Sequence, residues 1–256
     1  MTAHWRAWLH APEKAPVFFI VNQLAIPNPV DTFYANGWVA QAFPLYNGTP
    51  LAHLMEQGPW LIQPTADSLA PLGRLLDRHA LSDASWGWAY RSDATWQAQL
   101  HHWKRHQLAT LRGESVVFRL MDTRIARTLM PAMQPTDWTS LLNPVTELML
   151  DMLVPTVFSR PADCPPSLVE RPFVLESHLI AAWEQSDLAL EGYADTLTYE
   201  LWEAQGALAL QLDTPKGALQ QRLTQWLTQR SRQGSRLQAL TLRDFLADSG
   251  LDTPRP

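Results

Sequence analysis

Trp86-Gly-Trp-Ala-Tyr-Arg-Ser-Asp93 is the segment from which the class of fold is most readily inferred. Its run of apolar and aromatic residues is typical of a strand, and it ends in an arginine and an aspartate. Helical periodicity begins directly afterwards. A second stretch, Phe118-Arg-Leu-Met-Asp-Thr-Arg124, repeats this order of apolar run, charged residues and helix. The repeated alternation of strand and helix predicts an α/β fold, with a mixed sheet flanked by helices.

Short runs with the character of strands recur through the first part of the chain. They lie at 17–21, 39–43, 60–62, 86–90 and 116–121. The clearest helical pattern lies between the last two runs, where Trp96, Leu100 and Trp103 begin an apolar stripe that continues to Leu111. Such a stripe predicts a helix with one face on the core.

A proline-rich segment, 156–171, separates this part from the rest of the chain. Proline cannot continue a helix or a central strand, so we interpret the segment as a linker. Residues 1–155 are then the α/β lobe, and residues 172–256 are predicted to form a smaller, all-helical lobe. In that lobe Thr214-Pro215 is predicted to start a helix, and Thr241 with Asp244 has the spacing of a capping box. Residues 207–212 are ambiguous, because their leucines alternate as they would in a strand.

The composition combines few charges with many tryptophans. Charged residues make up 18% of the 256 residues, against about 25% in typical soluble domains. Most of the twelve tryptophans are expected in the core and a few at a partner interface, where tryptophan is enriched. The net charge of −5 gives no overall attraction to a phosphate backbone, so no nucleic-acid partner is expected.

Charge is segregated in the last third of the chain. Eight acidic and no basic residues lie between Pro172 and Pro215, whereas Lys216 to Arg243 holds six basic residues and no acid. We interpret the two blocks as solvated helix faces, or as faces that lie against one another. A patch that steers a charged partner is the alternative.

The expected compartment follows from cysteine and hydropathy. Cys164 is the single cysteine, so it cannot form an internal disulfide and suits a reducing compartment. The first ten residues lack the basic start and apolar stretch of a signal peptide. The longest apolar run, 17–21, is far shorter than the ~20 residues of a membrane helix. We therefore expect a soluble, cytoplasmic protein without a membrane span.

Sequence motifs of the common nucleotide-binding and hydrolase sites are absent. Neither GxGxxG, GxxxxGK[ST] nor GxSxG occurs. His102 and His106 have the spacing of a zinc pair on a helix, but neither an HExxH glutamate nor a nearby cysteine completes a site. We interpret both as solvated histidines, and expect neither a metal nor a cofactor. Cys164 is interpreted as an inert thiol, because it lies between Asp163 and two prolines, away from a helix N-terminus.

Charged residues at two strand ends form the one constellation that suggests a site. Alternation along 116–121 places Arg119 on the same face as Val117 and Met121. If both faces of the sheet are covered, as in α/β lobes, Arg119 is buried or half-buried and its guanidinium needs an anionic partner. Asp93 and Asp122 are the nearest candidates, and each is also a predicted N-cap of the helix that follows. We favour a structural network of ion pairs and caps, with contact to a partner as the alternative. An enzyme that uses Asp93 and Asp122 as acid and base is a further alternative.

Four short blocks of the sequence resemble the domain-of-unknown-function family 4123. The matching positions are Pro44, Leu45, Tyr46, Gly48, Trp86, Gly87, Arg91, Ser92, Asp93, Phe118, Arg119, Asp122, Arg124, Pro144 and Val145. In the third block Leu120 and Met121 stand where the family commonly has aromatic residues, and Thr123 stands where it has proline. These changes keep the apolar character of the block.

Members of that family serve as adaptor chaperones of the bacterial type VI secretion system. The resemblance implies a protein without catalytic activity, which holds a cognate toxic effector in the cytoplasm and promotes its loading onto the VgrG or PAAR spike. The candidate partner-binding residues are Tyr46, Trp86, Trp88, Arg91, Asp93, Arg119, Asp122 and Arg124. A carbohydrate-binding module with exposed tryptophans is another alternative, which the expected cytoplasmic location disfavours.

Overall fold

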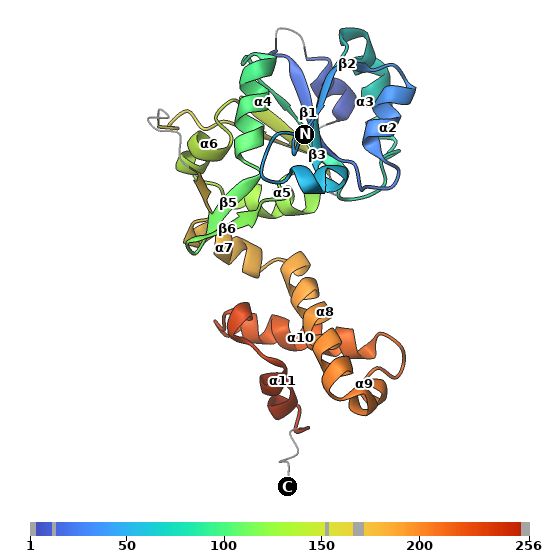
Figure 1. The fold of residues 1–256 in the computed structure, drawn as a ribbon, viewed down its shortest axis with the longest axis vertical. Coiled ribbons are helices and arrows are strands. Elements are labelled where there is room, and N and C mark those ends of the chain that lie inside the picture. Colours follow the sequence, from blue (N-terminus) through green and yellow to red (C-terminus); the bar gives the residue numbers. More distant parts are fainter. Residues whose placement is uncertain (1–3, 12–13, 152–153, 166–171, 252–256) are drawn as a thin grey trace. The chain divides into compact units, whose positions relative to one another are not determined.

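The computed structural model describes residues 4–11, 14–151, 154–165 and 172–251. The chain divides into an N-terminal unit, Met1–Glu176, and a C-terminal unit, Ser177–Pro256 (Figure 1). Strands and helices build the N-terminal unit, and helices build the C-terminal unit, which confirms the predicted α/β class with a helical C-terminal region. A hydrophobic core lies within each unit.

A six-stranded sheet forms the centre of the N-terminal unit. Its strands follow the spatial order β2 (Val39–Pro44), β3 (Pro59–Pro64), β1 (Val17–Asn22), β4 (Gly87–Arg91), β7 (Glu147–Leu150) and β8 (Thr156–Ser159). The predicted strands at 17–21, 39–43, 60–62 and 86–90 are confirmed. Neighbouring strands pair antiparallel throughout this sheet, so the parallel pairs expected of a mixed sheet are not found in it.

Helices cover both faces of the sheet, so β1 and β4 are buried along their whole length. On one face, α1 (Trp5–Leu9), α2 (Pro29–Ala35) and α3 (Leu69–Asp77) share a core with Phe19 and other residues of the sheet. On the opposite face, the rings of Trp88 and Tyr90 pack against Trp103 of α4 (Trp96–Arg105), with centroids 5.6 and 5.5 Å away. Alternate residues of one strand therefore serve two separate packing layers.

A second, small sheet replaces the predicted strand 116–121. It contains β6 (Glu114–Val117), β5 (Leu108–Leu111) and β9 (Phe173–Val174), and β5 pairs with β9 in parallel. The predicted strand is wrong in its extent, since β6 ends at Val117. The residues that follow turn inward: Phe118 packs on Phe173, and Trp88 Nε1 donates to the carbonyl of Leu120 at 2.8 Å.

The predicted helical stripe also ends early, because α4 stops at Arg105 and Leu111 belongs to β5. A two-residue turn, Arg112-Gly113, connects β5 to β6 with positive φ at both residues. This backbone is the favoured connection of a tight hairpin. The chain then continues into α5 (Thr123–Leu129) and α6 (Pro135–Leu141).

Part of the segment interpreted as a linker belongs to the large sheet. β8 is an edge strand of the large sheet, and its paired residues lie between Pro155 and Pro161. An edge strand tolerates such flanking prolines because its outer side needs no donors. The N-terminal unit consequently extends to Glu176, beyond the predicted end at residue 155. Residues 166–171 of the predicted linker lie outside the described residues.

The C-terminal unit is helical. Its helices are α7 (Ser177–Glu184), α8 (Asp187–Ala204), α9 (Gly206–Leu212), α10 (Ala218–Arg232) and α11 (Leu242–Asp248). Among the described residues, short 3₁₀ turns occur in both units: η1 (Ala52–Gln57), η2 (Ala66–Ser68) and η3 (Met130–Ala132) in the N-terminal unit, and η4 (Leu237–Ala239) in the C-terminal unit. Leucines of α8, α9 and α10, together with Phe245, form the core of this unit.

Local capping signals in this unit are partly confirmed. Thr241 and Asp244 form the predicted capping box at the start of α11. The ambiguous residues 207–212 are helical, as part of α9. The start predicted at Thr214 is wrong, because Gly217 is the N-cap of α10 and takes a left-handed backbone there. Among the described residues, no helix has both the length and the apolar character needed to cross a membrane.

Candidate functional site

Five of the eight candidate partner-binding residues are buried in the N-terminal unit: the four named next, and Asp122, which is described below. Tyr46, Trp86, Trp88 and Arg91 are each at most 3% exposed. Burial raises the pKa of the Tyr46 phenol, against the opposing charge of nearby Arg119. Trp86 Nε1 donates to Asp151 Oδ2 at 3.3 Å. These side chains stabilise the fold and present no surface to a partner in this structure.

Arg91 connects the end of β4 to the N-terminal segment. Its Nη1 donates to the carbonyl of Ala15 at 2.7 Å, and its Nη2 donates to the carbonyls of Trp8 and Leu9 at the end of α1. The guanidinium also lies 4.8 Å from the Trp8 ring centroid. A cation is favourable at the carbonyl end of a helix, so Arg91 acts as the C-terminal cap of α1.

The carboxylate partner of Arg91 is Glu147 on β7, a residue that the sequence analysis did not select. Arg91 Nε lies 3.2 Å from Glu147 Oε1, an ion-pair contact without hydrogen-bond alignment. Burial lowers the pKa of Arg91, and Glu147 opposes that shift. Lys14 Nζ binds the other oxygen of Glu147 at 2.9 Å. One carboxylate therefore holds a buried and an exposed cation.

The block around Asp122 fastens α5 to β4. Asp122 is the predicted N-cap of α5, and it binds the Arg124 guanidinium at 2.7 and 3.0 Å. The next residue, Thr123, is fully buried, and its hydroxyl donates to the carbonyl of Gly87 and accepts from the amide of Gly87. Thr123, which stands where the family commonly has proline, thus forms both hydrogen bonds between the two elements.

Two predictions about charged residues in these blocks are wrong. Arg119 is exposed, not buried, because the strand that would have carried it to the sheet ends at Val117. Asp93 is exposed and does not cap α4, since the hydroxyl of Thr95 accepts from the amide of Ala98 and is the N-cap. The structure therefore does not bring Arg119 together with Asp93 and Asp122 in one buried network.

His102 of α4 and His106, the C-cap of that helix, are not solvated, contrary to the prediction. His106 is 8% exposed, and His102 Nε2 lies 2.7 Å from the carbonyl of Leu141. Burial, helped by the charge of His106, lowers the pKa of His102 to about 3. His102 is consequently neutral and donates its Nε2–H to Leu141. Among the described residues, no group of three or more His, Cys, Asp or Glu side chains is placed to hold a metal ion.

A groove on the surface of the N-terminal unit lies between α4 and the turn after β2. Its volume is about 740 Å³. The residues that line it are Phe43, Gly48, Thr49, Pro50, Trp96, Gln97, Leu100, His101, Lys104, Arg105 and Leu108. We call it the α4 groove. Two of its walls come from segments that are far apart in the sequence, and one of them is a block of the family resemblance.

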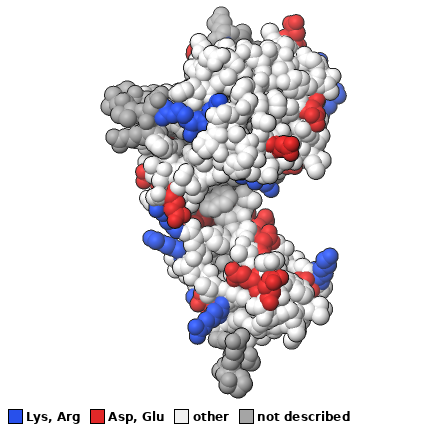
Figure 2. Space-filling model, in the orientation of Figure 1, with Lys and Arg blue, Asp and Glu red and all other residues white. Residues whose placement is uncertain are grey.

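The floor of the α4 groove is apolar and its rim is basic. Phe43, Trp96 and Leu100 are each half-buried, so part of every side chain remains available. Lys104 Nζ lies 5.3 Å from the Phe43 ring centroid, within range of a cation–π contact. None of the residues that line the groove is acidic. On the face drawn in Figure 2, basic side chains gather in the region of α4.

Gly48 shapes one wall of this groove. It has a φ of +68°, and a Cβ at this position would lie 3.1 Å from Lys104 Nζ. Glycine adopts this backbone without strain and leaves the ammonium group its place. The apolar stripe of α4 is the sequence pattern that could have indicated the groove. Its residue Trp103 is buried in the core, whereas Trp96 and Leu100 of the same stripe are only half-buried.

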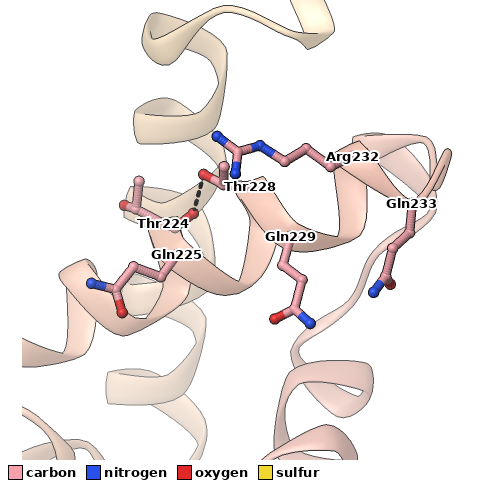
Figure 3. Close-up of a pocket in the computed structure, with 6 residues that line it drawn as sticks. All are labelled: Thr224, Gln225, Thr228, Gln229, Arg232 and Gln233. Carbon is pink, nitrogen blue, oxygen red and sulfur yellow. Dashed lines mark hydrogen bonds between the residues drawn. The ribbon is translucent and has the colours of Figure 1, made fainter.

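The C-terminal unit has a cavity of another character. It measures about 460 Å³ and is lined by Thr224, Gln225, Thr228, Gln229, Arg232 and Gln233. Figure 3 shows that all six come from α10 and its C-cap, and that Thr228 donates to the carbonyl of Thr224. Its lining side chains carry amide, hydroxyl and guanidinium groups, and none of the residues that line it is acidic.

The comparison with known families agrees with the resemblance. Residues 17–140 match the family described as Domain of unknown function (DUF4123), which is the family that the four sequence blocks resemble. No curated protein and no solved structure matches the chain. The matched segment includes both walls of the α4 groove.

Proposed function

We propose that this protein is an adaptor chaperone of the type VI secretion system. It binds a cognate toxic effector in the cytoplasm and promotes the loading of that effector onto the VgrG or PAAR spike. The observation that carries the proposal is the α4 groove, whose apolar floor and basic rim are built by residues of the family segment. Burying apolar area inside a polar rim is how protein interfaces bind a chain segment.

The composition of the groove defines the client segment. Phe43, Trp96 and Leu100 accept apolar side chains, while Lys104 attracts a carboxylate at the rim. An amphipathic segment with Leu or Phe on one face and Asp or Glu beside it satisfies both parts. Charge of opposite sign speeds the encounter and fixes the orientation of the segment.

The positions of the two aspartates support a binding protein over the enzyme alternative. Asp122 is 2% exposed and is bound by Arg124, whereas Asp93 is exposed at the start of α4. Neither carboxylate lines the α4 groove. An acid–base pair needs both groups within reach of one substrate atom.

Co-expression with the effector encoded beside the gene tests the proposal. We expect the effector to be soluble and to co-purify with the native chain, and Lys104→Glu to reduce its recovery about tenfold. Lys216→Glu makes the same charge change in the C-terminal unit and should leave recovery unchanged. An effector that is equally soluble and equally secreted without this protein would refute the adaptor role.

A further inference from the structure

A patch of exposed apolar side chains lies elsewhere on the N-terminal unit. Leu24, Ile26, Tyr34 and Met55 are 49, 79, 53 and 42% exposed. They come from the loop after β1, from α2 and from η1. We call these four residues the β1–α2 patch. Single exposed apolar residues are ordinary, but a group of large ones marks an interaction site.

Gln23 joins the parts of this patch. Its Nε2 donates to the carbonyls of Met55 and Gly58 at 2.8 and 2.9 Å, and its Oε1 accepts from Trp60 Nε1 at 3.1 Å. The Tyr34 ring lies edge-on to Trp60, with centroids 6.4 Å apart. One side chain therefore holds the loop after β1 against η1 and β3.

Hydrogen bonds fix the loop that carries Leu24 and Ile26. The amide of Ile26 donates to Asp83 Oδ2 at 3.1 Å, and the amide of Leu24 donates to Asn22 Oδ1 at 3.2 Å. Asp83 itself accepts from the amide and hydroxyl of Ser85 at 2.8 and 2.7 Å. The apolar side chains are thus presented from an ordered backbone, which lowers the entropy cost of binding.

The surroundings of the patch are acidic. The stretch that carries the patch, residues 15–73, contains Asp31 and Glu56 beside the patch residues and neither lysine nor arginine. Asp31 lies one helical turn from Tyr34, and Glu56 follows Met55; both carboxylates are exposed. Burial works to raise the pKa of Asp83, but the hydrogen bonds from Ser85 and Ile26, together with the charge of Arg124, outweigh it and lower the pKa. Arg124 is a basic residue on this side, and its guanidinium is bound by Asp122. The patch therefore has the opposite charge to the α4 groove, with which it shares no residue.

We infer that the β1–α2 patch is a second docking surface, which binds an apolar segment of a partner protein that carries lysine or arginine. The inference rests on the proposed adaptor function, because a protein that passes a client to another protein needs two surfaces. The two surfaces have opposite charge, so the α4 groove binds acidic amphipathic segments and the β1–α2 patch binds basic ones. Like charge then keeps each segment away from the wrong surface.

Two labelled peptides test this inference on the full chain. Both are amphipathic helices with a leucine face; one has lysine and the other glutamate on the polar face. By fluorescence anisotropy, the leucine–lysine peptide should bind, and Leu24→Asn with Ile26→Asn should weaken it at least about tenfold. Glu56→Lys should weaken it as well. Leu210→Asn changes an exposed leucine of the C-terminal unit, 64% exposed, and should have no effect.

Three results would overturn the inference. The first is equal binding of the leucine–glutamate peptide to the patch, which would remove the role of charge. The second is unchanged binding of the leucine–lysine peptide to the double variant, with a melting temperature that shows intact folding. The third is a dimer in sedimentation that Ile26→Asn returns to monomers, since the patch would then bind a second copy. Effector recovery with Lys104→Glu reports on the groove alone, so a failure of this inference is distinguishable from a failure of the adaptor role.

Discussion

Replacement of Arg91 by alanine is the most direct test of how the family blocks stabilise the N-terminal unit. The side chain is 3% exposed and donates to the carbonyls of Trp8, Leu9 and Ala15. Arg91→Ala leaves these carbonyls without their donor and leaves Glu147 without its buried cation. Removal of one partner from a buried pair typically costs about 3–5 kcal/mol. We expect a loss of this size in the free energy of unfolding.

The assay is urea unfolding followed by tryptophan fluorescence. Nine of the twelve tryptophans precede Ser177, so the signal reports mainly on the N-terminal unit. Lys14→Ala is the matched control, because Lys14 binds the same carboxylate from an exposed position, with 48% of its side chain accessible. An exposed ion pair contributes at most about 1 kcal/mol. A loss for Arg91→Ala as small as that for Lys14→Ala would refute the structural role of Arg91.

Three further predictions follow from the same unit. Thr123→Val removes both hydrogen bonds to Gly87 at constant shape and should destabilise the protein by about 1–3 kcal/mol in urea unfolding. Gly87→Ala should lower the yield of folded protein, measured by near-ultraviolet circular dichroism, because a Cβ would lie 2.4 Å from the carbonyl oxygen of Ile20; a native spectrum and melting temperature would contradict this. The folded-state pKa of His102, about 3, lies below its usual value, so the unfolded chain binds more protons between the two pKa values. The contribution of neutral His102 to the free energy of unfolding is complete above pH 6.5 and falls by about 2 kcal/mol at pH 5. His102→Gln should lack this part of the pH dependence when both proteins are compared in parallel urea titrations.

Elements that depend on local spacing were predictable from the sequence. The buried runs 17–21 and 86–90 are strands, because a continuous apolar run fits only a position covered on both sides. Asp122 caps α5, and Thr241 with Asp244 caps α11, because these bonds join residues two or three positions apart. The family blocks likewise indicated the family itself.

Elements that depend on distant partners were not predictable in the same way. The run 116–121 has the composition of a strand, but contacts with Phe173 and Trp88 draw its second half into a loop. Arg119 consequently lies on the surface. Arg91 was selected correctly as a special residue, but its partner Glu147 lies 56 positions away, and no local pattern identifies it.

Periodicity and short-range hydrogen bonds were enough to predict the class of fold, the helical C-terminal region and the caps at Asp122 and Thr241. They did not predict the N-caps of α4 and α10, which are Thr95 and Gly217 and not Asp93 and Thr214. Which aromatic side chains are buried in the core and which remain accessible depends on the tertiary structure. Trp86 and Trp88 fill the core. Trp96 is half-buried on α4 and lines a groove together with Phe43, which comes from β2, far away in the sequence. The physical reason is that burial is a property of all the surfaces that meet at a residue, and those surfaces come together only when the whole unit has folded.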